Sequence, residues 1–227
     1  MLVYSDPGDD GEMTIENGYQ AYPDGPARQP SSVQRGSVQF LSLYPGDPLT
    51  PGKPSYKNAT RVDPDSPGLS KPRIPSIPIS YEDALPLLAS LNGHGMQIPE
   101  WQGGLSSKGI DYFTGPSNST VRMNNQIEET IKPIWNAYAI VPGSSAEEEI
   151  VFLGNHRDAW DKGASDPISG TTAMTQVIQG VGKLWNKGWR PRRTIVFASW
   201  DAEEYGLVSL FPCPRCQRID VCLDRKY

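Results

Sequence analysis

Two apolar runs with one amphipathic segment between them constrain the fold of this chain more than any other feature. Residues 149–154 read EIVFLG and residues 194–200 read TIVFASW, and both runs have the length and the aromatic and β-branched content of buried strands. Residues 169–186, which lie between the runs, predict a helix that stops near Gly188. Its apolar stripe consists of Ala173, Val177, Ile178, Val181 and Leu184. A strand, a helix and a strand in this order predict a βαβ unit with two parallel strands.

Acidic residues and a histidine follow the two predicted strands. His156 and Asp158 come directly after the first strand, Asp166 comes just before the predicted helix, and the sequence DAEE follows the second strand. Ligands of open α/β sheets bind at the carboxyl ends of the strands, so we expect these side chains at one edge of the sheet. The only other histidine, His94, lies in an NGHG turn that is typical of an exposed loop.

The residue types at this edge indicate part of a two-metal hydrolase site. Zinc binds histidine nitrogen and carboxylate oxygen at about 2 Å, and a bridging carboxylate holds two ions about 3.5 to 4 Å apart. His156, Asp166 and Glu204 are the candidate metal ligands. Glu203 is the candidate general base for the attacking water. Asp158 is the second catalytic candidate, in a supporting position, because its carboxylate is expected to accept the other imidazole N–H.

Each of these residues also has a purely structural interpretation. His156 alone would be a hydrogen-bonded histidine near a strand end, and the adjacent glutamates alone would be a solvated helix start near the positive end of the helix dipole. Both features occur at strand ends of one βαβ unit, in a chain with two histidines. This coincidence favours the metal-site interpretation.

The first half of the chain has a different character. Up to about residue 75, apolar pieces such as LVYS and VQFLSLY alternate with the breaks YPDGP, PGDP and TPGKP, which predicts short strands and turns. Residues 78–92 predict a short helix with Ser80 as N-cap and Pro86 within its early turns. Residues 130–141 predict a strand that forms a hairpin with the run EIVFLG or lies beside it.

Composition excludes some classes of function. The net charge of the 227 residues is −5 and the basic residues are scattered, so no nucleic-acid partner is expected. No stretch approaches the roughly 20 apolar residues of a membrane span, and the first residues lack the basic and apolar regions of a signal peptide. We therefore expect neither an anchor nor a signal peptide in this chain.

Two further kinds of motif give weaker signals. The sequons at Asn58 and Asn118 would permit N-glycosylation, but they also suit solvated polar loops. All three cysteines, Cys213, Cys216 and Cys222, lie near the C-terminus. One C-x-x-C pair without a second pair or a nearby histidine is weak evidence for a zinc knuckle.

Two of these motifs carry a resemblance to a known family. The segments NHRDAWDKGASDPISG and KGWRPRRTIVFASWDAEEYGL resemble the glutamate carboxypeptidase II family, which includes prostate-specific membrane antigen and, as non-catalytic members, the transferrin receptors. A weaker likeness through LVYSDP, YPDGP, VQRGSVQF, GDPLTPG and IPSIPISYEDALPLL points to the apical, protease-associated domain of that family. The resemblance covers almost all of the chain from Leu2 to Leu207.

The resemblance implies an α/β fold made of two incomplete domains. Residues 1–120 would be a partial β-rich protease-associated (apical) domain with its connecting segment. Residues 121–209 would be the N-terminal half of a zinc-peptidase α/β/α sandwich, and residues 210–227 an unrelated tail.

The resemblance also implies the activity of a binuclear zinc exopeptidase. In that scheme His156 binds one zinc ion, Asp166 bridges the two and Glu204 binds the other, while Glu203 carries the proton of the attacking water. The family has a further aspartate and a second histidine downstream that this chain lacks, so the chain alone is expected to be an inactive fragment. The alternative is a non-catalytic, truncated or transferrin-receptor-like binding protein. The receptor-like form predicts lost ligands, yet the matched ligands are all present.

Substitutions elsewhere limit what the resemblance implies. Ser37 replaces an asparagine that helps the family's glutamate carboxypeptidases to bind substrate, so a preference for glutamate does not follow. Thr50 matches the family's calcium site but Lys53 replaces its tyrosine, so no calcium site is expected. The family implies a peptide substrate, a homodimer for the full-length protein only, and a membrane-associated parent with its catalytic part outside the cytosol or in the vacuole.

Overall fold

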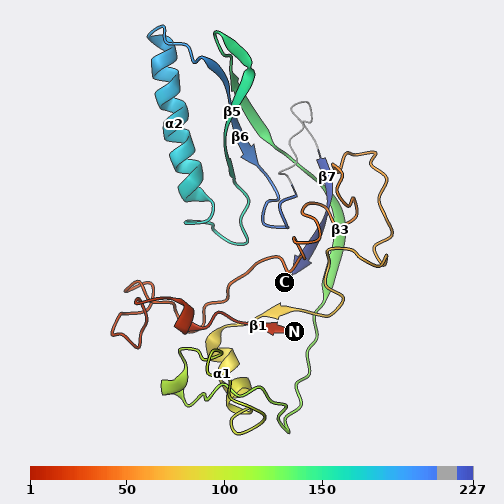
Figure 1. The fold of residues 1–227 in the computed structure, drawn as a ribbon, viewed down its shortest axis with the longest axis vertical. Helices are drawn as coiled ribbons and strands as arrows, with labels where there is room; N and C mark the ends of the chain where they lie inside the picture. The colour runs from red at the N-terminus through yellow and green to blue at the C-terminus, as the bar shows by residue number, and fades with distance from the viewer. Residues whose placement is uncertain (209–218, 227) are drawn as a thin grey trace. The chain divides into compact units, whose positions relative to one another are not determined.

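The computed structural model describes residues 1–208 and 219–226, which fall into two compact units (Figure 1). Unit 1 consists of Met1–Arg35 and Arg73–Asn125, and unit 2 consists of Gly36–Pro72 and Gln126–Tyr227. One division lies near residue 120, where the first predicted domain ends, but the contacts assign residues 36–72 to unit 2. The domain assignment itself stays a prediction.

Unit 1 contains little regular structure. Strand β1 (Leu2–Val3) pairs in parallel with β2 (Ile77–Pro78). Helix α1 (Tyr81–Ala89) follows β2, and two short 3₁₀ helices span Pro7–Asp9 and Ser106–Lys108. The described part of unit 1 is therefore mainly loops around one helix.

Helix α1 begins where the sequence predicts, directly after Ser80, but it ends at Ala89, three residues before the end of the predicted segment. The Ser80 hydroxyl oxygen accepts the backbone N–H of Asp83 at 3.0 Å, which caps the first turn. Pro86 lies inside the helix, as expected. Buried Tyr81 packs with Leu105 and Ile110 into the core of unit 1.

The carboxylate of Asp6 joins distant segments of unit 1. It accepts the backbone N–H groups of Gly8 at 2.8 Å and Gly104 at 2.6 Å. It also accepts the hydroxyl groups of Tyr112 at 2.6 Å and Tyr4 at 3.1 Å. One side chain thus holds residues about one hundred positions apart.

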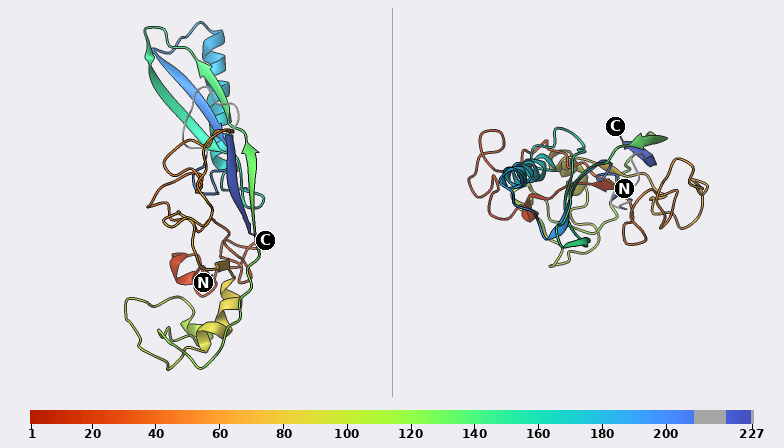
Figure 2. Two further views of the ribbon diagram at one scale, coloured as in Figure 1. Left: turned by 90° about the vertical axis from the view of Figure 1, so that its right-hand side faces the viewer. Right: turned by 90° about the horizontal axis from the view of Figure 1, so that it is seen from above.

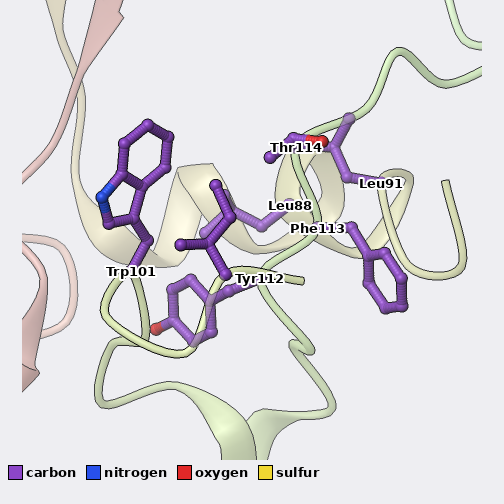
Figure 3. A pocket seen from close by; sticks show the side chains of 7 residues that line it. Leu88, Leu91, Trp101, Tyr112, Phe113 and Thr114 are labelled. Atoms are coloured by element: carbon purple, nitrogen blue, oxygen red, sulfur yellow. The ribbon is translucent and has the colours of Figure 1, made fainter. Parts of the chain in front are cut away.

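An apolar pocket of about 190 Å³ lies beside α1 (Figure 3). It is lined by Leu88 of the helix and by Leu91, Ile98, Trp101, Tyr112, Phe113 and Thr114 of the segments that follow it. The Trp101 residue is 68% exposed. None of the predicted metal-site residues lines this pocket.

Unit 2 contains the predicted βαβ unit. Strands β5 (Ala146–His156) and β6 (Arg193–Trp200) are parallel, and helix α2 (Ile168–Asn186) connects them. Figures 1 and 2 show α2 running along one face of this sheet, where it contacts both strands. The mixed α/β class predicted from the sequence is confirmed.

The predicted neighbour of β5 is wrong. Strand β4 (Ala137–Val141) pairs antiparallel with β6, and the sheet order is β4-β6-β5, so β4 and β5 are neither a hairpin nor adjacent. The central strand β6 is the most buried of the three, and its Val196, Phe197 and Ala198 are buried. The most buried strand therefore takes the position where both of its edges are paired.

The predicted core stripe of α2 is also wrong. Its buried residue is Met174, 8% exposed, whereas Val177 and Leu184 are each 46% exposed. Apolar side chains recur both in the predicted stripe, at positions 173, 177, 178, 181 and 184, and at positions 174, 181 and 185, so position 181 belongs to both. Helical periodicity alone does not decide between these two overlapping faces.

A second, two-stranded sheet completes unit 2. Strand β3 (Ile127–Ile134) pairs antiparallel with β7 (Ile219–Lys226), from Ile127 opposite Lys226 to Ile134 opposite Ile219. The backbone of the predicted tail therefore forms a strand over these residues. Cys213 and Cys216 lie outside the described residues.

Residues 36–72 depart from the short strands predicted for this region. In the described structure the run VQFLSLY forms turns, and Phe40 and Leu43 are exposed. Leu49 is buried in this segment together with several polar side chains, among which Ser55 donates to the Asp47 carboxylate at 2.8 Å. The backbone N–H of Gly46 donates to the Gly206 carbonyl at 2.8 Å, which ties the segment to the turn after β6. No helix within residues 1–208 is long and apolar enough to span a membrane.

Candidate active site

The ends of β5 and β6 bring the predicted site residues to one edge of the sheet. The parallel register aligns His156 with Trp200, the last residues of the two strands. Just beyond them, the backbone N–H of Arg157 donates to the Trp200 carbonyl at 2.9 Å. The segments HRD and DAEE therefore start side by side, as expected for the carboxyl ends of parallel strands.

His156 lies at the centre of the acidic residues. Its Nε2 atom is 2.9 Å from Oδ1 of Asp166, and its Nδ1 atom is 3.8 Å from Oε2 of Glu203. The imidazole is largely buried, with 16% of the side chain exposed, whereas the side chain of Asp166 is 75% exposed. The structure thus brings together three of the five predicted site residues, His156, Asp166 and Glu203.

The ring orientation is fixed by Asp158, but not as the sequence predicts. The closest acceptor to Nδ1 is the backbone carbonyl of Asp158 at 3.1 Å, while its carboxylate lies 3.6 Å away. That carboxylate instead accepts the backbone N–H of Glu203 at 3.0 Å and of Glu204 at 3.1 Å. Asp158 therefore links the histidine to the glutamate pair.

Both glutamates have raised pKa values. Burial is the main cause of the raised pKa of the Glu203 carboxyl; His156 opposes it, and the charges of Asp158 and Asp166 add to it. Burial is also the main cause of the raised pKa of the Glu204 carboxyl, followed by the charges of Asp166 and Glu203. Among the described residues, no hydrogen bond or ion pair joins the Glu204 carboxylate to His156 or Asp166. Glu204 is held at the site through its backbone.

A polar network that the sequence analysis missed holds the turn after β6. Asp201 accepts the backbone N–H of Trp135 at 3.0 Å, and its own N–H donates to Oδ1 of Asn136 at 2.9 Å. The Arg157 guanidinium donates to the Ser199 carbonyl at 2.8 Å and to the Trp135 carbonyl, and lies 3.8 Å from the Asp201 carboxylate. The available signal was that these polar residues also lie at the ends of predicted strands.

The backbone of the same turn is strained. Ala202 has φ = 57°, in the left-handed region, and only 2% of the residue is exposed. It packs with Ile134 and Val208, and neighbouring Tyr205 contacts the Trp160 ring at a centroid distance of 5.0 Å. Packing therefore holds an unfavourable backbone conformation directly before the glutamate pair.

The donor atoms of the pair His156 and Asp166 fit a metal ion. A carbonyl oxygen only accepts hydrogen bonds, so the contact with Asp158 needs the ring proton on Nδ1, and Nε2 is the ring nitrogen that faces Asp166. Two donors at about 2 Å from one zinc ion lie about 3.3 Å apart, close to the 2.9 Å between these atoms. No group of three His, Cys, Asp or Glu side chains in the described part of the chain already forms a metal-binding arrangement. The fit of the site to a zinc ion therefore rests on His156 and Asp166, and the two glutamates lie nearby.

Comparisons with known proteins agree with the geometry. Residues 136–209, which include β4, β5, α2, β6 and all five predicted site residues, match Peptidase family M28. The chain is 51% identical over 214 residues to a probable glutamate carboxypeptidase of Arthroderma benhamiae, a match that covers 91% of this chain and 28% of that protein.

Two other relatives show the same pattern of coverage. The identity is 42% over 211 residues to vacuolar protein sorting-associated protein 70 of Saccharomyces cerevisiae and 40% over 222 residues to the aminopeptidase NAALADL1 of Mus musculus. Each match covers 92% of this chain, but 25% and 28% of the relatives. The resemblance to the glutamate carboxypeptidase family is confirmed, and the chain spans about a quarter of the length of these relatives.

Proposed function

We propose that this chain, whose residues 136–209 match Peptidase family M28, carries part of the active site of a binuclear zinc exopeptidase of the glutamate carboxypeptidase type. Residues 121–209 would supply the first half of the α/β/α peptidase domain, and residues 1–120 would be part of its protease-associated domain. The substrate class is a peptide, and the reaction is hydrolysis of a peptide bond by water.

One observation carries this proposal. The Nε2 atom of His156 and the carboxylate of Asp166 face each other at 2.9 Å. Two acceptors at this distance repel unless a cation, either a proton or a metal ion, lies between them. A neighbouring histidine and bridging carboxylate are the donor types that zinc uses in two-metal hydrolases.

The residues divide into ligands and proton carriers. His156, Asp166 and Glu204 would hold two zinc ions, with Asp166 shared between them. Zinc, when bound, supplies a Lewis acid that polarises the peptide carbonyl. Glu203 would take the proton of the attacking water at its carboxylate and pass it to the leaving amine.

The raised pKa of Glu203 suits this role. A general base transfers protons best when its pKa approaches the working pH, and burial moves the pKa of Glu203 in that direction. Asp158 would fix the base through the backbone: its carboxylate accepts the Glu203 N–H at 3.0 Å. The catalytic contribution of Asp158 would thus be positional.

Replacing each glutamate by glutamine in a separate variant distinguishes the general base from the metal ligand. We expect Glu203→Gln to leave zinc affinity close to that of the parent chain and, when the substitution is made in the full-length protein, to abolish peptide hydrolysis. Glu204→Gln should lower zinc affinity by roughly tenfold or more, since it removes a ligand. Affinity is measured by competition with a chromophoric chelator, which does not depend on turnover. Equal zinc affinity in all three proteins would refute the assignment of Glu204 as a metal ligand. Peptide hydrolysis by Glu203→Gln would refute the assignment of Glu203 as the general base.

A further inference from the structure

We infer that Asn155 and Thr171 form a clasp that sets the separation of His156 and Asp166, and that both are positioning residues for the metal site. Neither residue was among those predicted from the sequence. The inference rests on the proposed function, because it concerns the residues that would bind zinc. It names side chains that contact neither metal nor substrate.

The Asn155 amide spans the base of the site. Its Nδ2 atom lies 2.6 Å from the carbonyl oxygen of His156, 3.1 Å from the carbonyl oxygen of Pro167 and 2.9 Å from Oγ1 of Thr171. One amide therefore contacts the first predicted ligand, the residue after the bridging ligand and the first turn of α2. These three acceptors lie on both sides of the loop that separates His156 from Asp166.

Thr171 closes the other side of the clasp. Its hydroxyl donates to the carbonyl oxygen of His156 at 3.1 Å, while its backbone N–H donates to the Pro167 carbonyl at 3.1 Å. Gly170 allows this close approach: a Cβ atom there would lie 2.3 Å from Oδ1 of Asn155. The start of α2 is thereby held against the end of β5.

The position of Asp166 depends on this contact. Its side chain is 75% exposed, and its contact in the described structure is the imidazole of His156. Packing therefore contributes little to its orientation, and the backbone around Pro167 has to place it. The clasp fixes that backbone against the carbonyl of His156, so loosening it should let the two donors drift apart. Partners that orient ligands in this way affect metal affinity without binding the metal.

The hydroxyl of Thr171 offers the sharpest test. Thr171→Val keeps the side-chain shape and removes the hydrogen bonds, whereas Thr171→Ser keeps the hydroxyl. Thr175→Val is the matched control, because Thr175 lies one turn further along α2 and its hydroxyl donates to the Thr171 carbonyl at 2.8 Å, away from the loop. Asn155→Ala is the second variant and tests the amide. Each chain is titrated with Co²⁺, whose visible absorption reports ligand geometry, and with Zn²⁺ by competition; melting of the metal-free chain reports folding.

We expect Thr171→Val and Asn155→Ala to bind both ions about 10- to 100-fold more weakly and to show an altered Co²⁺ spectrum. Thr171→Ser should restore both readouts, and Thr175→Val should match the parent chain. Equal affinity and spectrum in Thr171→Val and the parent would overturn the clasp, and so would a loss in Thr175→Val as large as that in Thr171→Val. If the parent chain binds neither ion, the proposed metal site fails and the clasp fails with it.

Discussion

The Asp158 carboxylate joins two segments of the candidate site that are 45 positions apart in sequence. It accepts the N–H groups of Glu203 and Glu204, while its own carbonyl faces His156. The sequence HRD indicates that a carboxylate lies near the histidine. It gives no information on the backbone N–H groups that approach from the turn after another strand. The sequence therefore predicts the presence of Asp158 at the site and misassigns its partner.

Substitution of Asp158 should disturb both glutamates at once. In Asp158→Asn one acceptor oxygen becomes an NH₂ group that faces a backbone N–H, so one hydrogen bond is replaced by a repulsive contact. We expect zinc affinity to fall by roughly tenfold, as for other residues that orient metal ligands. Chelator competition measures this change, with the exposed Asp161→Asn as control. Affinity equal to that of the control would show that Asp158 does not position the site.

Asp6 makes a separate prediction about pH. Burial raises the pKa of its carboxyl, but hydrogen bonds from Gly104, Tyr112, Gly8 and Tyr4 outweigh burial and lower the pKa overall. A lowered pKa in the folded state means that the stabilisation is present above the unfolded pKa of about 3.9 and is lost as the pH falls through the folded value.

We expect Asp6→Asn to lower the free energy of unfolding by about 2 kcal/mol at pH 7, because hydrogen bonds to a charged acceptor are lost. The difference from the parent chain should shrink as the pH falls below about 4. Denaturant titrations followed by circular dichroism at several pH values measure both effects, and the exposed Asp24→Asn is the control. A difference that stays constant between pH 7 and pH 2 would contradict the role of the charged carboxylate.

At the scale of elements, the βαβ unit was predictable and the arrangement of its neighbours was not. The runs EIVFLG and TIVFASW are short, apolar and separated by a helical pattern, and each feature is local in sequence. The placement of β6 between β4 and β5 depends on pairing between strands more than fifty residues apart. The short run VQFLSLY resembles a strand locally but finds no partner strand in the described structure.

Helix α2 provides a direct test of which of its apolar faces packs. Met174 is buried, so Met174→Ala should lower the free energy of unfolding by about 2 to 3 kcal/mol through lost burial and a residual cavity. Val177→Ala shortens a side chain of the predicted stripe whose residue is 46% exposed, and should cost less than about 0.5 kcal/mol. Denaturant unfolding of the two variants measures the difference. Similar losses would mean that the predicted stripe containing Val177 is buried after all.

At the scale of the whole molecule, the site lies entirely within unit 2, and its residues come from the ends of β5 and β6, the loop before α2 and the turn after β6. The sequence predicts this grouping because His156, Asp166 and Glu203 follow elements whose order implies a parallel sheet. The clasp of Asn155 and Thr171 depends on the side-chain contacts of the folded chain. Neither residue type indicates such a role by itself.

The most direct test of the account compares the two histidines of the chain. We expect the parent chain to bind Zn²⁺ in a chelator competition, His94→Ala to bind it equally well, and His156→Ala to lose at least tenfold in affinity, because only His156 faces the acidic residues. Equal affinities in the two variants, or no zinc binding by the parent chain, would contradict the central claim that the ends of β5 and β6 form a zinc site.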